Sequence, residues 1–104
     1  MLQDKIMKLK PEETDLLGRW VLVEGKVIGD ETAKRIEALV SNDLQKIAVN
    51  DGGWDILYRD PQDSRYWELT FPESHMQGGG PPRLTYLSVE QVREKYGHEG
   101  HEYE

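Results

Sequence analysis

Two aromatic segments separated by a proline turn constrain the fold of this chain more than any other feature. The turn, Asp60-Pro61-Gln62-Asp63, fits a type I β-turn, because proline presets φ and the Asp60 side chain can accept a hydrogen bond from the backbone N–H two residues later. The flanking segments, 54–58 and 65–71, are rich in aromatic and β-branched residues, which is typical of strands. We therefore expect a β-hairpin here, followed by a glycine–proline loop at 72–82.

The second strand of this hairpin has two different faces. Strand side chains alternate between the faces of a sheet. One face then carries Trp67, Leu69 and Phe71, and the other carries Tyr66, Glu68 and Thr70. We expect the first face to lie in the core, and the second to be exposed sheet or a contact surface. Trp20 and Trp54 are most simply core residues as well.

Length and composition fit one soluble domain over residues 1–104. Hydrophobic residues make up 37% of the chain and charged residues 32%, which is typical of a small globular protein. The chain contains no cysteine, no run of roughly 18–20 apolar residues, and no signal-peptide pattern at its N-terminus. We expect a cytoplasmic protein with a folded core at 16–96 and loosely ordered ends at 1–10 and 98–104.

The charge balance restricts the class of partner. Twenty acidic residues against thirteen basic ones give a net charge of −7. This argues against nucleic acid as a partner, because phosphates attract stripes of lysine and arginine. It favours a basic partner, or it serves solubility alone.

The first thirty residues predict a short helix and a small hairpin. Residues 10–18 have the pattern of one or two helical turns, with Pro11 suited to the first helical position and Gly18 to the end. Residues 19–24 predict a strand, and 27–28 predict a short return strand after a glycine turn.

A long amphipathic helix is expected next, from Glu31 to about Val49, with Asp30 as its N-cap. Apolar residues recur at spacings of three and four along it. This stripe contains Ala33, Ile36, Leu39, Val40, Leu44, Ile47 and Ala48.

The C-terminal third predicts one strand and one short helix. Residues 83–87 form the strand, and Ser88 with Gln91 forms a capping box for a helix over 89–96. The fold class is therefore α+β: an antiparallel sheet of about four strands, with the long helix on one face and the other face partly open. Strand 83–87 or 19–24 could form an exposed edge that another chain extends.

Two motifs have the residue types of ligand-binding sites but lack the neighbouring elements or residues that such sites need. Gly78-Gly79-Gly80 lacks the strand-loop-helix setting and the Lys-Ser/Thr ending of a phosphate loop, so it is a crossing loop or a loop shaped for a partner. His98 and His101 have the spacing of a metal pair, but no second ligand pair lies nearby. We expect no metal and no cofactor.

One weak catalytic arrangement supplies an alternative function. His75 lies close in sequence to Glu68 and Glu73, and such a group could act as an acid–base pair. A small hydrolase or metal-dependent enzyme is therefore one alternative, and a general protein-interaction module is another. Adjacent loop residues rarely converge on one point, which favours a protein that is not an enzyme.

Charged and aromatic residues crowd the hairpin. They are either a solvated turn with weak surface pairs such as Arg59–Asp63, or a contact patch with aromatic and arginine anchors. The hairpin residues in question are Tyr58, Arg59, Asp60, Asp63, Arg65, Tyr66 and Glu68.

Several motifs in order resemble a small immunity family of bacterial polymorphic-toxin systems, immunity family twenty-seven. The resemblance covers about residues 16–96. Its most specific pieces are Tyr58-Arg59-Asp60-Pro61, Tyr66-Trp67-Glu68-Leu69-Thr70 and Gly78-Gly79-Gly80-Pro81-Pro82. Leu17-Gly18-Arg19-Trp20, Arg35-Ile36-Glu37 and Gly53-Trp54 add to it.

The resemblance implies a non-enzymatic antitoxin that forms a heterodimer with the C-terminal toxin domain of a contact-dependent inhibition system or a related effector. Such toxins are commonly nucleases with basic clefts, so the inhibitor would occlude the active or substrate-binding site. The residues expected to contact the toxin are Tyr58, Arg59, Asp60, Asp63, Tyr66, Glu68, Glu73 and His75. Contacts could instead lie along Glu12, Glu13, Asp15, Glu31, Arg35 or Asp43.

Overall fold

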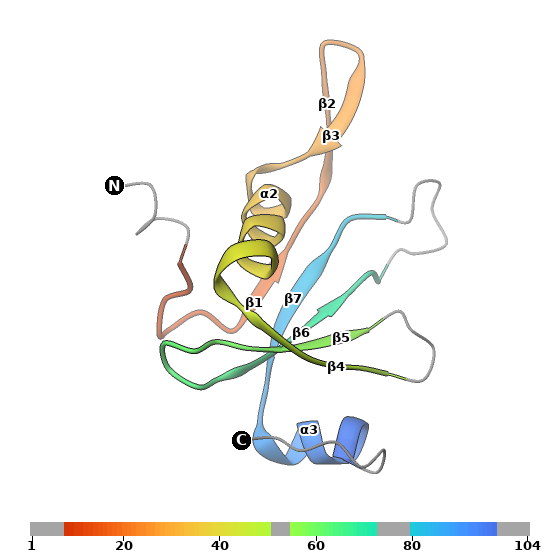
Figure 1. Cartoon of the computed structure of the whole chain (residues 1–104). Coiled ribbons are helices and arrows are strands. Elements are labelled where there is room, and N and C mark those ends of the chain that lie inside the picture. Colours follow the sequence, from red (N-terminus) through yellow and green to blue (C-terminus); the bar gives the residue numbers. More distant parts are fainter. Residues whose placement is uncertain (1–7, 51–54, 73–79, 98–104) are drawn as a thin grey trace.

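Five antiparallel strands form the main sheet of the computed structural model, in the spatial order β1-β7-β6-β5-β4 (Figure 1). The structure describes residues 8–50, 55–72 and 80–97. The strands of this sheet are β1 (Asp15–Leu17), β4 (Gln45–Val49), β5 (Ile56–Arg59), β6 (Tyr66–Thr70) and β7 (Arg83–Leu87). The expected α+β class is confirmed, with five strands in the main sheet rather than about four.

A separate two-stranded ribbon projects from the body of the molecule (Figure 1). It consists of β2 (Trp20–Val23) and β3 (Lys26–Gly29), and we call it the arm. Glu24 and Gly25 turn the chain with φ values of 51° and 80°, as two-residue hairpin turns require. The two strands predicted here are confirmed, and neither belongs to the main sheet.

The helix predicted over 31–49 is helical as far as Asp43, and the expectation was wrong for the last residues, where 45–49 form a strand. α2 spans Glu31–Ala38, and Asp30 caps it by accepting a hydrogen bond from the Ala33 N–H at 2.8 Å. A π-helical turn, η1 (Leu39–Asp43), follows, and Leu44 has extended backbone. β4 then pairs with β5, with a register shift at Lys46/Ala48. The periodicity of a short apolar run cannot distinguish a helix from a strand. Hydrogen bonding with β5 makes these residues a strand.

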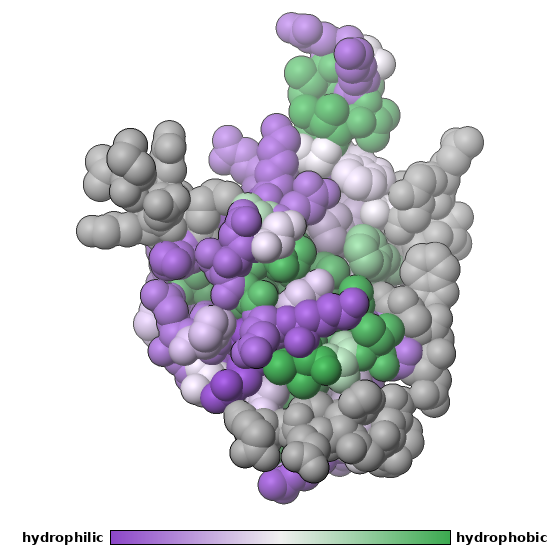
Figure 2. Space-filling model, in the orientation of Figure 1, coloured by the Kyte–Doolittle hydropathy of each residue, from purple (hydrophilic) through white to green (hydrophobic). Residues whose placement is uncertain are grey.

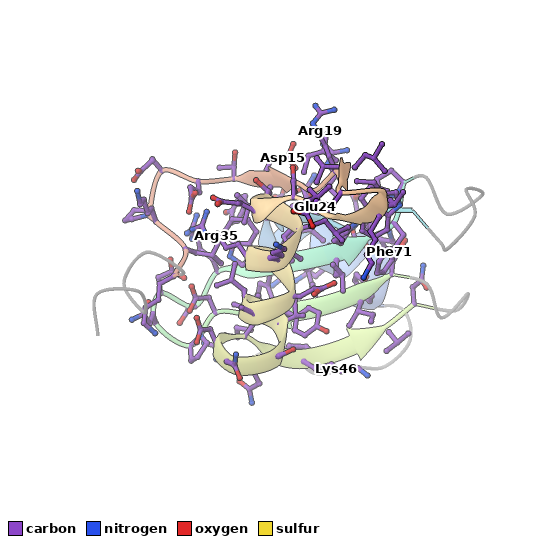
Figure 3. All side chains as sticks on the ribbon, turned by 90° about the horizontal axis from the view of Figure 1, so that it is seen from above. Asp15, Arg19, Glu24, Arg35, Lys46 and Phe71 are labelled. Atoms are coloured by element: carbon purple, nitrogen blue, oxygen red, sulfur yellow. The ribbon has the colours of Figure 1, made fainter. Side chains whose placement is uncertain are left out.

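A helix packs on each face of the sheet. α2 lies over one face (Figure 3), where it packs with Trp67, Leu69 and Leu84. α3 (Val89–Tyr96) lies over the other face, where Val92 and Tyr96 pack with Leu57, Tyr66 and Leu87. α3 therefore covers only part of the face that was expected to be partly open, because Asp15 and Leu17 on β1 remain exposed on it. The predicted capping box of Ser88 and Gln91 is confirmed.

The N-terminal segment forms a strand instead of the helical turns predicted over 10–18. A turn at Pro11–Glu12 leads into β1, which pairs with β7 through Leu16↔Leu84. β7 is consequently an interior strand between β1 and β6, so the exposed edge considered for 83–87 does not exist. In the parts of the chain described, no helix is long and apolar enough to cross a membrane.

Candidate functional site

The turn between β5 and β6 is built around Asp60. Its N–H donates to the Arg65 carbonyl at 2.8 Å, its carbonyl accepts from the Ser64 N–H at 2.7 Å, and its Oδ1 accepts from the Gln62 N–H at 2.9 Å. The last bond is the side-chain contact predicted for this turn. The loop closes at Ser64, whose φ is 68°. Asp60 is buried, so its carboxylate shapes the turn.

The two hairpin tyrosines lie on opposite faces of the sheet and both are buried. Tyr58 belongs to the core under α2, and Tyr66 belongs to the core under α3. Burial raises the pKa of the Tyr58 hydroxyl. Neither ring offers its face to solvent, which corrects the expectation that Tyr66 lies on an exposed surface.

Glu68 is also buried, with 7% of its surface exposed. The Tyr96 hydroxyl donates to Glu68 Oε2 at 2.8 Å, and Lys95 Nζ lies 2.5 Å from the same oxygen and 2.7 Å from Asp55 Oδ2. Burial is the largest single influence on the Lys95 ammonium and by itself lowers its pKa, but hydrogen bonds and charge attraction to Asp55 and Glu68 together raise that pKa above its usual value. A buried charge needs such partners, so this network fastens α3 to the sheet.

Arg59 and Asp63 are the predicted contact residues that the described structure leaves accessible. Arg59 is half-buried and donates from Nη2 to Ser64 Oγ at 3.0 Å. Asp63 is exposed and pairs with Arg65, at 2.8 Å between Oδ2 and Nε. Glu73 and His75 lie outside the described residues.

Arg65 has a structural role that the sequence reasoning did not find. Its guanidinium donates to the Glu13 carbonyl at 2.8 Å and to the Lys10 carbonyl at 2.9 Å. It also lies 4.8 Å from the centre of the Trp67 ring. Residues 65 and 67 lie on the same face of the strand, so the alternation of strand side chains could have indicated that Arg65 stacks on Trp67. The carbonyl partners, more than fifty positions away, leave no local signal.

Ion pairs hold most of the alternative contact residues. Arg35 on α2 (Figure 3) binds Glu13, and Arg83 on β7 binds Asp15 through two hydrogen bonds of 2.9 Å. These bonds lower the pKa of the Glu13 and Asp15 carboxyls, although burial opposes the shift in both. Asp43 Oδ1 lies 4.0 Å from Lys8 Nζ. Glu12 and Glu31 are exposed.

The exposed apolar surface concentrates on the arm, which was not among the predicted contacts. Figure 2 shows it as a hydrophobic zone below a hydrophilic tip. Its exposed apolar residues are Val21, Leu22, Val23 and Val27. The unbroken run Val21-Leu22-Val23 was the available signal, because a strand with one solvated face alternates with polar residues. A cleft of about 250 Å³ lies between Trp20, α2 and the end of β6.

The described residues include exposed apolar and exposed charged side chains. Within 8–50, 55–72 and 80–97, no three acidic or histidine side chains are grouped to hold a metal ion. The Glu68 carboxylate that was considered as a base is occupied by Tyr96 and Lys95. The fold and surface define a small α+β protein with apolar and polar patches suited to binding another protein.

The chain belongs to the Immunity protein 27 family, whose family model matches residues 22–88. The match extends from β2 in the arm to Ser88 before α3, so it includes most of the arm and the whole β5–β6 hairpin. Neither the curated proteins nor the solved structures contain a match to this chain. The resemblance drawn from the motifs is confirmed, and membership of an immunity family implies a toxin as partner.

Proposed function

We propose that this chain is the antitoxin of a bacterial toxin–immunity pair, which binds a cognate toxin domain one to one in the cytoplasm of the producing cell and blocks it. The observation that carries the proposal is membership of the Immunity protein 27 family over residues 22–88. The toxin belongs to a contact-dependent inhibition or related polymorphic-toxin system.

The toxin in this proposal is a nuclease. Nucleases bind phosphates with basic clefts, and the net charge of −7 on this chain is complementary to such a surface. Opposite charge speeds encounter, while shape and local pairing select the cognate toxin. Carboxylates of the inhibitor then occupy positions that substrate phosphates would take.

Inhibition in this proposal is by occlusion, without a reaction on the immunity protein. The engagement of Glu68 with Tyr96 and Lys95 supports this, because a general base must reach the proton that it abstracts. His75 and Glu73 stay proposed toxin contacts.

The hairpin would contribute to toxin binding through two kinds of residue. Arg59 and Asp63 are accessible and would touch the toxin directly. The buried residues would act by holding the structure in place. Tyr58, Tyr66 and Glu68 would stabilise the two strands, and Asp60 would stabilise the turn that carries Arg59 and Asp63.

Co-expression with the toxin domain encoded in the neighbouring upstream reading frame tests this function. We expect the chain to restore growth and to elute with the toxin domain as a one-to-one complex. A purified toxin domain that cleaves DNA or RNA should lose that activity with an equimolar amount of the chain. Growth arrest that persists, together with no complex, would contradict the function. A rescued toxin that cleaves neither nucleic acid would contradict only the nuclease assignment.

A further inference from the structure

The arm carries large apolar side chains that are mostly exposed to solvent. Leu22 is 71% exposed and Val27 is 66% exposed, and they face each other across the ribbon in the register Leu22↔Val27. The two side chains can contact each other across the ribbon, but most of their apolar surface still faces solvent. Contiguous exposed apolar surface of this kind marks an interaction site.

The apolar face of the arm continues into the cleft at its base. Strand side chains alternate, so Trp20 shares a ribbon face with Leu22 and its partner Val27. Trp20 also lines the cleft of about 250 Å³, together with Ile36, Val40, Leu69, Phe71 and Pro82. Trp20 therefore connects the outer arm with the cleft between α2 and the end of β6.

A carboxylate at the rim of the cleft sets the charge of a matching ligand. Glu37 on α2 lines the cleft and is exposed, and no ion pair joins it to another described residue. A lysine or arginine can bury its aliphatic stem on apolar side chains while its cation reaches a carboxylate. The cleft thus fits a basic side chain flanked by apolar ones.

We propose that the toxin domain docks on this surface, with an apolar segment along the Leu22–Val27 face and a lysine or arginine whose stem enters the cleft and whose cation meets Glu37. The inference rests on the proposed function and names the surface that performs it. Charge favours the toxin over a second copy of this chain, because two chains of −7 repel each other and both present Glu37. The Arg59–Asp63 turn lies at the other end of β6 from this cleft, so its proposed contact is separate from the centre of the interface.

Titration calorimetry with the purified toxin domain tests the surface. Leu22→Thr and Val27→Thr keep strand-forming residues and remove apolar area, and together they should weaken binding at least about tenfold. Val89→Thr is the matched control, because Val89 is 53% exposed on α3, and its variant should bind like the wild type. Glu37→Gln should weaken binding more at low salt than at high salt, whereas Glu94→Gln on α3 should leave that salt dependence unchanged.

Each outcome decides the inference. If the wild type binds the toxin and the Leu22/Val27 variant binds equally well, the surface is wrong while the proposed function stands. If the wild-type chain is a dimer that this variant dissociates without change in toxin binding, the arm joins two copies and the inference is overturned. A wild-type chain that does not bind the toxin overturns the proposed function and this inference together.

Hydrogen exchange on the wild-type complex gives a second measurement that needs no variant. The amides of β2 and β3 should exchange more slowly when the toxin is bound, because docking covers an otherwise solvated ribbon. Unchanged exchange in the arm, with protection elsewhere on the chain, would overturn the inference even if the double variant failed to fold.

Discussion

The Arg35 guanidinium on α2 donates hydrogen bonds to both carboxylate oxygens of Glu13. Nη1 lies 2.7 Å from Oε2, and Nη2 lies 2.7 Å from Oε1. Nη2 also donates to the Lys8 carbonyl at 2.7 Å, and the Lys10 N–H donates to Glu13 Oε1 at 2.8 Å. One helix side chain therefore fixes the segment that leads into β1, and through β1 it helps to define the edge of the sheet.

This pair should make stability depend on acid pH. The hydrogen bonds from Arg35 lower the folded-state pKa of Glu13 below its ordinary value of 4.5, against the opposing effect of burial. The stabilisation is thus complete above pH 4.5 and is lost as pH falls through the lowered pKa. Glu13→Gln should lower the free energy of unfolding at pH 7 by about 1 kcal/mol.

Urea unfolding at several pH values measures this. The Glu13→Gln variant should lose less stability than the wild type below pH 4.5, because it lacks a carboxyl group whose pKa is lowered by folding. The neighbouring exposed Glu12→Gln is the control and should keep the wild-type profile. Equal acid slopes in the wild type and Glu13→Gln would contradict a role for the pair.

Arg65→Lys should loosen the segment before β1. A lysine cannot donate from a planar fork to the carbonyls of Lys10 and Glu13 while stacking on Trp67. We expect a loss of about 2 kcal/mol in unfolding free energy and faster hydrogen exchange in residues 8–14. Arg93→Lys, at an exposed position on α3, should change neither quantity. Wild-type exchange in Arg65→Lys would show that the segment is held by other contacts.

Tyr96→Phe should weaken the attachment of α3. The ring stays in the core, but Glu68 Oε2 loses a hydrogen bond of 2.8 Å in a buried position. Hydrogen bonds to charged groups contribute about 1.5–3 kcal/mol, and thermal or urea unfolding should show a loss in that range. Tyr86→Phe is the control, because Tyr86 is partly exposed. A Tyr96→Phe variant as stable as the control would mean that Lys95 alone satisfies the carboxylate.

Gly18→Ala should destabilise the junction between the sheet, the arm and α2. A Cβ at this position would lie 2.9 Å from Ala33 Cβ and 2.9 Å from the Pro82 carbonyl oxygen, and the second contact is to backbone that cannot swing away. We expect a loss of about 1–3 kcal/mol. At Gly97 the nearest such contact is 3.6 Å, so Gly97→Ala should stay within about 0.5 kcal/mol of the wild type. Equal unfolding midpoints for the two variants would contradict the close packing at Gly18.

The candidate site was predictable only in part. The aromatic alternation of β6 located the hairpin and put Trp67 in the core correctly. The same alternation did not decide whether the face of Glu68 is exposed. It shows that the two faces of the strand differ, but it does not show what covers the polar face. Val92 and Tyr96 on α3 cover part of that face. Toxin contact by the hairpin residues stays a prediction.

The sequence by itself determined the features that depend on residues within about four positions of each other. These include the Asp60 turn, the Asp30 cap, and the capping box of Ser88 and Gln91. Only the tertiary structure decided that residues 45–49 form a strand, that β1 pairs with β7, and that the arm stands apart from the sheet. The physical reason is that strand pairing and helix packing derive their free energy from partners far along the chain, and a local pattern of apolar residues does not specify those partners.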